Sequence, residues 1–181
     1  MQTSKHLKAT PDDSPSDTAA PAPAFGATAQ WVVFCLDRAR YALPLAAVDR
    51  IVRAVHVTAL PLGPDIVLGA IDVAGRVLPV FNLRRRFRLP ERPIEPADHF
   101  LIARTARRTV VLAIDTAQGV LERPAADMIH AASVAPNLEH LQGVIQLEDG
   151  LVLIHDLEHF LSPDEAHELD EAMSQRASHA N

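Results

Sequence analysis

The sequence predicts a mainly β protein made of two similar small barrels that pack together. One observation is a repeat: GAIDVAGRVLPVFNL at residues 69–83 recurs without a gap as GVIQLEDGLVLIHDL at residues 143–157. A second is that short apolar runs alternate with turn residues along most of the chain, as in all-β barrels and sandwiches. An offset of 74 residues is too long for a solenoid repeat. It indicates two barrels, each marginal in core size alone, that share one core.

The elements expected in the first half follow from turn signals and apolar runs. Residues 1–29 are rich in Pro, Ala, Ser and Asp, and we expect a disordered tail. WVVFCL and YALPL predict two strands around a polar turn, followed by one helical turn over residues 46–52. GAIDV and RVLPVF predict a second strand pair around Ala74 and Gly75. NLRRRF predicts a short helical turn with Asn82 as its N-cap.

The second half is expected to repeat this order. HFLIAR with TVVLAI, and GVIQL with LVLIHDL, predict two further strand pairs. We therefore expect one domain over residues 30–162, with barrel subdomains at about 31–90 and 98–161. A helix is expected over residues 163–181, because Ser162 is a natural N-cap and Pro163 suits the first helical position. Its thin apolar face predicts weak packing or fraying: Ala166, Leu169, Ala172 and Met173.

Composition limits the classes of partner and compartment. The net charge of −6 argues against a general nucleic-acid binder, which needs basic side chains to neutralise phosphates. The single cysteine, Cys35, lies in an apolar run, which indicates a buried thiol in a reducing cytoplasm. No apolar stretch approaches the ~20 residues of a membrane span, and residues 1–28 lack the apolar core of a signal peptide. We expect a cytoplasmic protein without direct membrane insertion.

Four stretches carry a resemblance to a known family: YALPLAAVDRI (41–51), LPLGPDIVLGAIDVAGRVLPVFNLR (60–84), VVLAIDTAQGVL (110–121) and GVIQLEDGLVLIHDLEHFL (143–161). In these stretches the chain resembles the CheW family of bacterial chemosensory coupling proteins. The resemblance implies a CheW-like fold of two intertwined five-stranded SH3-like barrels. It also implies a non-enzymatic adaptor without a cofactor. Such an adaptor bridges the regulatory domain of a CheA-type histidine kinase and the cytoplasmic hairpin tip of chemoreceptors, at membrane receptor clusters.

By this resemblance, the partner-binding residues are expected on the first helical turn, at the β-turn and after the following strand: Val48, Arg50, Ile51, Ala74, Gly75, Arg76, Leu83 and Arg84. The apolar ones, Val48, Ile51 and Leu83, could equally be plain core. Arg84 matches an arginine of the family pattern. Arg50 stands where the family usually has Glu, and Ala74 where it usually has Arg. The opposite charges that the family usually has at these two positions are therefore both absent from this chain. Because they would support each other, their joint loss leads us to hypothesise a divergent receptor contact.

Three further features admit more than one interpretation. A basic cluster is either a patch for an acidic partner or a solvated face: Arg84, Arg85, Arg86, Arg88 and Arg92. His155 and His159 raise the alternative of a metal-dependent enzyme, but no third ligand has a clear spacing. The chain also lacks a Gly-rich phosphate loop and a Gly-x-Ser-x-Gly elbow, so we expect no enzyme. The last alternative is a CheW-like scaffold that recruits or localises a different partner outside standard chemotaxis.

Overall fold

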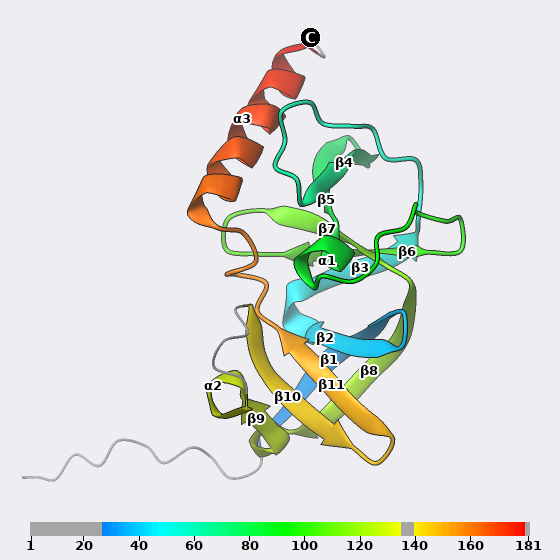
Figure 1. The fold of residues 1–181 in the computed structure, drawn as a ribbon, viewed down its shortest axis with the longest axis vertical. Helices are drawn as coiled ribbons and strands as arrows, with labels where there is room; N and C mark the ends of the chain where they lie inside the picture. The colour runs from blue at the N-terminus through cyan, green and yellow to red at the C-terminus, as the bar shows by residue number, and fades with distance from the viewer. Residues whose placement is uncertain (1–26, 135–139, 180–181) are drawn as a thin grey trace, which may run out of the picture.

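The protein is described here by a computed structural model, which covers residues 27–134 and 140–179. Two sheets lie one above the other along the long axis of the molecule (Figure 1). The six-stranded sheet has the order β8-β1-β2-β11-β10-β9, with bounds β1 Thr28–Leu36, β2 Ala39–Pro44, β8 Thr116–Pro124, β9 Met128–His130, β10 Leu141–Leu147 and β11 Gly150–His155. The five-stranded sheet has the order β3-β6-β7-β5-β4, with bounds β3 Val48–Arg53, β4 Val67–Val73, β5 Arg76–Phe81, β6 His99–Arg104 and β7 Thr109–Ile114. The predicted mainly β class is confirmed, with six and five strands in place of five and five.

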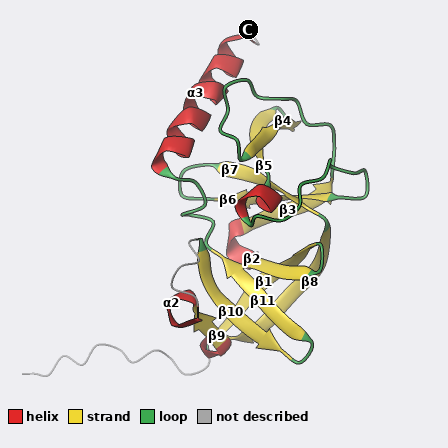
Figure 2. Cartoon of the chain, viewed as in Figure 1, coloured by secondary structure: helices red, strands yellow, loops and turns green. Residues whose placement is uncertain are grey.

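Helical segments are short apart from the last one (Figure 2). They are two 3-10 turns, Leu45–Ala47 and Ala125–Asp127, and the α-helices α1 Leu83–Arg86, α2 Ala131–Val134 and α3 Pro163–His179. The predicted cap of α1 is confirmed, because the Asn82 side chain accepts a hydrogen bond from the Arg85 backbone N–H at 3.2 Å. The bulk of the expected N-terminal tail lies outside the described residues. The prediction of a tail up to residue 29 is wrong at its end, because β1 begins at Thr28 and pairs with β8.

Each sheet takes strands from both halves of the chain. Strand β2 runs parallel to β11, and β5 runs parallel to β7. The hairpin β1–β2 therefore lies in the sheet of β8–β11, and β6–β7 lies in the sheet of β3–β5. The expected subdomain limits of 31–90 and 98–161 are wrong for this reason, because each segment contributes strands to both sheets. The strand order agrees with the expectation of intertwined barrels and not with two barrels that follow one another along the sequence.

Three clusters of buried side chains make up the interior. One cluster lies within the six-stranded sheet and includes Trp31 and Val33. A second lies within the five-stranded sheet and includes Val80 and Phe100. The largest joins the two sheets, and its members come from β1, β2, β5, β6, β7, α1 and α3. Residues of β1 alternate between the first cluster and the shared one because successive side chains of a strand point to opposite faces. The sheets thus share one core, as the repeat predicts.

The predicted helical turn over residues 46–52 is wrong beyond Ala47. Only the 3-10 turn Leu45–Ala47 is helical, and Val48–Arg53 forms strand β3, antiparallel to β6. The β-branched Val48, Ile51 and Val52 explain this outcome, because such side chains are stiff and pack well on a pleated surface.

Helix α3 buries three of the four residues of its thin apolar face. Leu169 is fully buried in the shared core, and Ala166 and Ala172 are buried beside it. The helix begins with a capping box: the Ser162 hydroxyl accepts from the Glu165 N–H, and the Glu165 carboxylate accepts from the Ser162 N–H at 2.8 Å. The helix lies against the lobe of the five-stranded sheet (Figure 1).

Candidate partner-binding site

The first group of predicted site residues lies on strand β3. Val48 and Ile51 are half-buried and pack against the shared core. Arg50 is exposed, and its Nε lies 3.5 Å from a carboxylate oxygen of Asp49. The two apolar side chains therefore contribute to the core, as one of the two interpretations predicted. Arg50 is the residue of this group that a partner can reach directly.

The second group forms the tight turn between β4 and β5. Ala74 and Gly75 have φ angles of 52° and 79°. Two positive φ angles are the backbone conformation of a type I′ hairpin turn, whose twist matches that of the flanking strands. The Asp72 carboxylate accepts a hydrogen bond from the Gly75 N–H at 2.7 Å, and Arg76 donates to the Thr109 hydroxyl at 3.1 Å. The turn is thus held firmly, and it projects into open space, since a Cβ on Gly75 would meet nothing within 4 Å.

The strand register brings these two groups to the same end of the five-stranded sheet. Val48 at the start of β3 pairs with Ala103 near the end of β6, and β6 turns into β7 through residues 105–108. Arg76 at the start of β5 contacts the start of β7. We call this the turn-end surface: Val48, Arg50, Ala74, Gly75, Arg76 and residues 105–108.

The last two predicted site residues lie elsewhere. Strand β5 runs from Arg76 to Phe81, so Leu83 and Arg84 follow it at the opposite end of the sheet. Leu83 is 2% exposed and belongs to the shared core. Arg84 is 7% exposed. The structure therefore separates both from the turn-end surface.

Arg84 is the centre of a partly buried ion network. Its guanidinium donates to the carboxylates of Asp37 and Asp115, each at 2.7 Å, and to the Pro90 carbonyl at 3.0 Å. The hydrogen bond from Arg84 lowers the pKa of Asp37 below its usual value. The same bond raises the pKa of the Arg84 guanidinium above its usual value. Arg84 therefore acts within the protein and is not free to bind a partner.

Most of the predicted basic cluster is also neutralised within the protein. Arg92 lies between Asp98 and Asp115, at 2.7 and 2.9 Å. Arg85 lies 3.0 Å from Glu91, and Arg86 lies 2.6 Å from Glu165. With its arginines paired in this way, the cluster does not form a continuous positive patch for an acidic partner.

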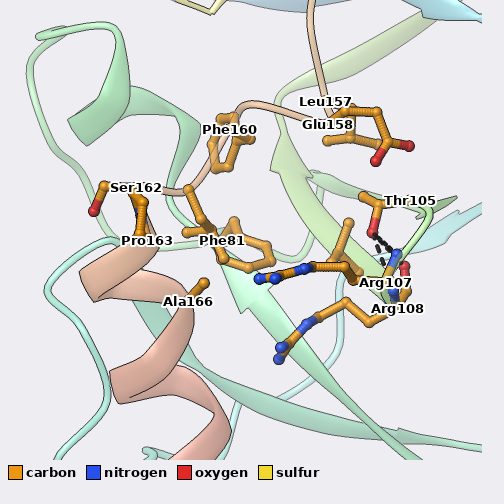
Figure 3. Close-up of a pocket in the computed structure, with 12 residues that line it drawn as sticks. Phe81, Thr105, Arg107, Arg108, Leu157, Glu158, Phe160, Ser162, Pro163 and Ala166 are labelled. Carbon is orange, nitrogen blue, oxygen red and sulfur yellow. Dashed lines mark hydrogen bonds between the residues drawn. The ribbon is translucent and has the colours of Figure 1, made fainter.

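An apolar pocket of about 270 Å³ opens beside the turn-end surface (Figure 3). Phe81 and Phe160 line it with their rings edge to face, 5.5 Å between centroids. The side chains of Arg107 and Arg108 extend from the β6–β7 turn toward Phe81 and α3. The Thr105 hydroxyl accepts from the backbone N–H groups of both arginines, at 3.2 and 3.0 Å, which fixes the turn at the rim.

Sequence reasoning did not find this pocket. Its lining comes from β5, the β6–β7 turn, the segment after β11 and the start of α3, so no local pattern reveals it. Arg108 pairs with Asp170 of α3, whereas Arg107 is exposed. A pocket with an apolar wall and a charged rim is the kind of site that takes an apolar side chain of a partner.

The histidines of the metal alternative lie in different surroundings. His155 is 5% exposed, and its ring stacks on Phe87 at 4.5 Å. His159 is exposed and pairs with Asp156 at 2.8 Å. Among the described residues, no three His, Cys, Asp or Glu side chains gather closely enough to hold a metal ion. In the same part of the chain, no helix has the length and apolar character needed to cross a membrane.

Comparison with known proteins identifies related sequences. The CheW-like domain family matches residues 30–165. A chemotaxis protein CheW of Treponema pallidum is 25% identical over 146 residues, which cover 77% of this chain and 86% of the relative. Protein FrzA of Myxococcus xanthus is 30% identical over 123 residues, which cover 65% of this chain and 74% of the relative. The crystal structure of the scaffolding protein TtCheW from Thermoanaerobacter tengcongensis matches with a TM-score of 0.70 at 21% identity, covering 77% of this chain and 96% of that one.

The family match covers most of the chain and, apart from the first two residues of β1, all strands of both sheets. The chain therefore belongs to the CheW-like domain family, and it shares the fold of the scaffolding protein TtCheW.

Proposed function

We propose that this chain is a non-enzymatic adaptor that couples the cytoplasmic hairpin tip of chemoreceptors to the regulatory domain of a CheA-type histidine kinase. The observation that carries the proposal is the family match over residues 30–165. Two further findings support it: related sequences are chemotaxis proteins, and TtCheW, which has the same fold, is a scaffolding protein. On this proposal the protein works in the cytoplasm, at membrane receptor clusters.

The receptor contact proposed here is the turn-end surface with the adjoining pocket. Arg50 and the turn residues Ala74 and Gly75 are accessible there, and Arg107 lies at the pocket rim. Leu83 and Arg84 are assigned to the protein's own framework, because both are buried and Arg84 has its acidic partners within the chain. Arg50 and Ala74 give this surface a charge pattern different from the Glu and Arg that the family usually has, so we propose a divergent receptor.

The experiment starts with a pulldown from cytoplasm and membranes, followed by titration of each captured partner alone. Capture of a CheA-type kinase and a chemoreceptor supports the adaptor function, and capture of neither refutes it. The double variant Arg50→Glu, Ala74→Arg then tests the receptor contact. Ala74 already has a positive φ angle, so arginine adds little backbone strain there. Arg38→Glu, Ala39→Arg is the matched control, since it makes the same pair of substitutions on the β1–β2 turn.

Each outcome of the titration has a distinct meaning. We expect the double variant to bind an ordinary receptor tip at least about tenfold more tightly than wild type, because restored charges complement such a tip, and tenfold corresponds to about 1.4 kcal/mol. Arg38→Glu, Ala39→Arg should bind like wild type. Equal binding by wild type and the double variant would sink the divergent-receptor hypothesis while leaving the adaptor function in place.

A further inference from the structure

The β6–β7 turn has a hydrogen-bond acceptor for each of its four backbone N–H groups. The Thr105 N–H donates to the Arg108 carbonyl at 2.8 Å. The N–H groups of Arg107 and Arg108 donate to the Thr105 hydroxyl at 3.2 and 3.0 Å. The Ala106 N–H donates to both oxygens of the Glu158 carboxylate, at 2.9 and 3.0 Å. Any other conformation of the turn would give up one of these bonds, so the backbone that carries Arg107 is fixed.

Glu158 reaches this turn from a distant part of the chain. It follows β11 of the six-stranded sheet and lies 52 residues after Ala106 in the sequence. A carboxylate that accepts from a backbone N–H makes a charge-assisted hydrogen bond, which is stronger than a neutral one. Helix α3 adds a second contact from outside the turn, because its Asp170 carboxylate accepts from Arg108. Two carboxylates from other segments therefore fix the position of the turn as well as its shape.

Arg107 is the charged residue of this turn whose side chain is left for a partner. It is exposed, and its guanidinium extends along the apolar pocket toward Phe81 (Figure 3). Among the residues that the structure describes, no group accepts a hydrogen bond from this guanidinium and no carboxylate pairs with it. The other two charged residues that line the pocket, Arg108 and Glu158, have the partners given above. The described lining thus combines an unpaired positive charge with an apolar wall.

A free guanidinium beside an apolar wall fits a partner that carries a carboxylate next to an apolar side chain. Guanidinium and carboxylate groups can form two parallel hydrogen bonds, which add direction to their attraction. When the apolar side chain fills the pocket it also removes water from around the ion pair, and the attraction is then screened less. A partner with a basic group at this place would be repelled by Arg107, so the same residue also acts against wrong partners.

We propose that Arg107 is a specificity-determining residue of the receptor contact, and that Glu158 is the positioning residue that holds it in place. This inference rests on the proposed function, since the partner is the chemoreceptor tip. Arg107 binds a carboxylate of that tip, and an apolar side chain beside the carboxylate enters the pocket lined by Phe81 and Phe160. Glu158 acts through the Ala106 N–H, because it fixes the backbone from which Arg107 extends.

The test combines binding and amide exchange on the full-length protein. The probe is the soluble hairpin tip of the chemoreceptor captured in the pulldown, titrated by calorimetry against wild type, Arg107→Gln, Glu158→Ala and the double variant. Glu158→Gln is the conservative variant, because its amide oxygen can still accept from the Ala106 N–H. Arg123→Gln and Glu148→Ala are matched controls at exposed sites on β8 and on the β10–β11 turn. Hydrogen exchange of the Ala106 amide, followed by NMR, reports on the turn itself.

The expected results separate the two roles. Arg107→Gln should bind the tip about tenfold more weakly than wild type, because a hydrogen-bonded ion pair is lost. Glu158→Ala should weaken binding about fivefold and speed exchange of the Ala106 amide at least about tenfold, and Glu158→Gln should restore most of both. In the double variant, loss of Glu158 should add little to loss of Arg107, because both act through one contact. Both controls should bind like wild type.

The inference and the proposed function fail in different ways. If wild type binds the tip and Arg107→Gln binds it equally tightly, Arg107 is not a contact and the inference alone is wrong. If the two single effects multiply in the double variant, or if Glu158→Ala leaves exchange of the Ala106 amide unchanged, Glu158 does not position Arg107. Capture of no chemoreceptor would refute the proposed function and with it the partner named here, while the exchange measurement would still decide whether Glu158 holds the turn.

Discussion

The burial of His155 predicts that the protein loses stability between pH 6.5 and pH 4.5. Burial, as the largest cause, lowers the pKa of its ring from 6.5 to about 4 in the folded state, and the nearby charges of His140 and Arg86 add to this. Asp156 acts in the opposite direction. In this pH window the unfolded chain takes up a proton that the folded chain does not, so lower pH favours unfolding.

The size of the effect follows from the width of the window. Each pH unit in which the unfolded state holds one more proton is worth about 1.36 kcal/mol, so two units give about 2.7 kcal/mol. His159 has the opposite sign, because Asp156 raises its pKa, but its side chain is exposed and the effect is screened. Carboxylates such as Asp98, with pKa values lowered from 3.8, lose their contribution only at lower pH. The window above pH 4.5 is therefore dominated by His155.

Urea unfolding at several pH values measures the pH dependence of the free energy of unfolding directly. Trp31 serves as the fluorescence probe, since it is the single tryptophan and is 4% exposed in the folded protein. We expect His155→Phe to remove most of the pH dependence and to leave stability at pH 7 equal to or above that of wild type. His56→Gln, at an exposed histidine, should keep the wild-type slope. If His155→Phe keeps the full slope, His155 does not carry the effect and the reasoning from burial is refuted.

Two further predictions concern packing and the ion network, and both are measured by urea unfolding at pH 7. Arg84→Met should lower the free energy of unfolding by about 2 kcal/mol, because it leaves Asp37 without a partner and Asp115 with Arg92 alone, and an unchanged value would contradict a structural role for Arg84. Leu169→Ala should cost about 3 kcal/mol, as expected for a fully buried leucine. A cost near zero would instead restore the expectation that α3 packs weakly.

Local features of the fold were predictable from the sequence. The Ala74-Gly75 turn, the cap at Asn82 and the capping residue Ser162 each depend on chemistry within a few residues. Strand β8 escaped prediction because nearly all its residues are exposed, so it lacks an apolar pattern. The exchange of strands between the halves was implied only by the family resemblance, since no local pattern encodes the parallel pairing of β2 with β11.

The candidate site was predictable only in part, for the same reason. The turn residues could be placed by the family resemblance, which aligns them directly. The role of Arg84 could not, because its partners Asp37 and Asp115 lie 47 and 31 residues away in sequence. A basic run such as LRRRF looks like a solvated patch until the acidic residues that face it are known.

The position of Arg84 suggests why an adaptor would keep such a network. Asp37 lies on the β1–β2 turn of the six-stranded sheet, whereas Arg84 follows β5 of the five-stranded one, and Asp115 joins β7 to β8. The Asp37 backbone N–H also donates to the Asp115 carboxylate at 2.7 Å. The ion pairs therefore cross from one sheet to the other and, together with the shared core, fix the relative orientation of the two barrels. If the chain holds two partners at once, as proposed, it can fix the geometry between them only if its own halves do not move apart.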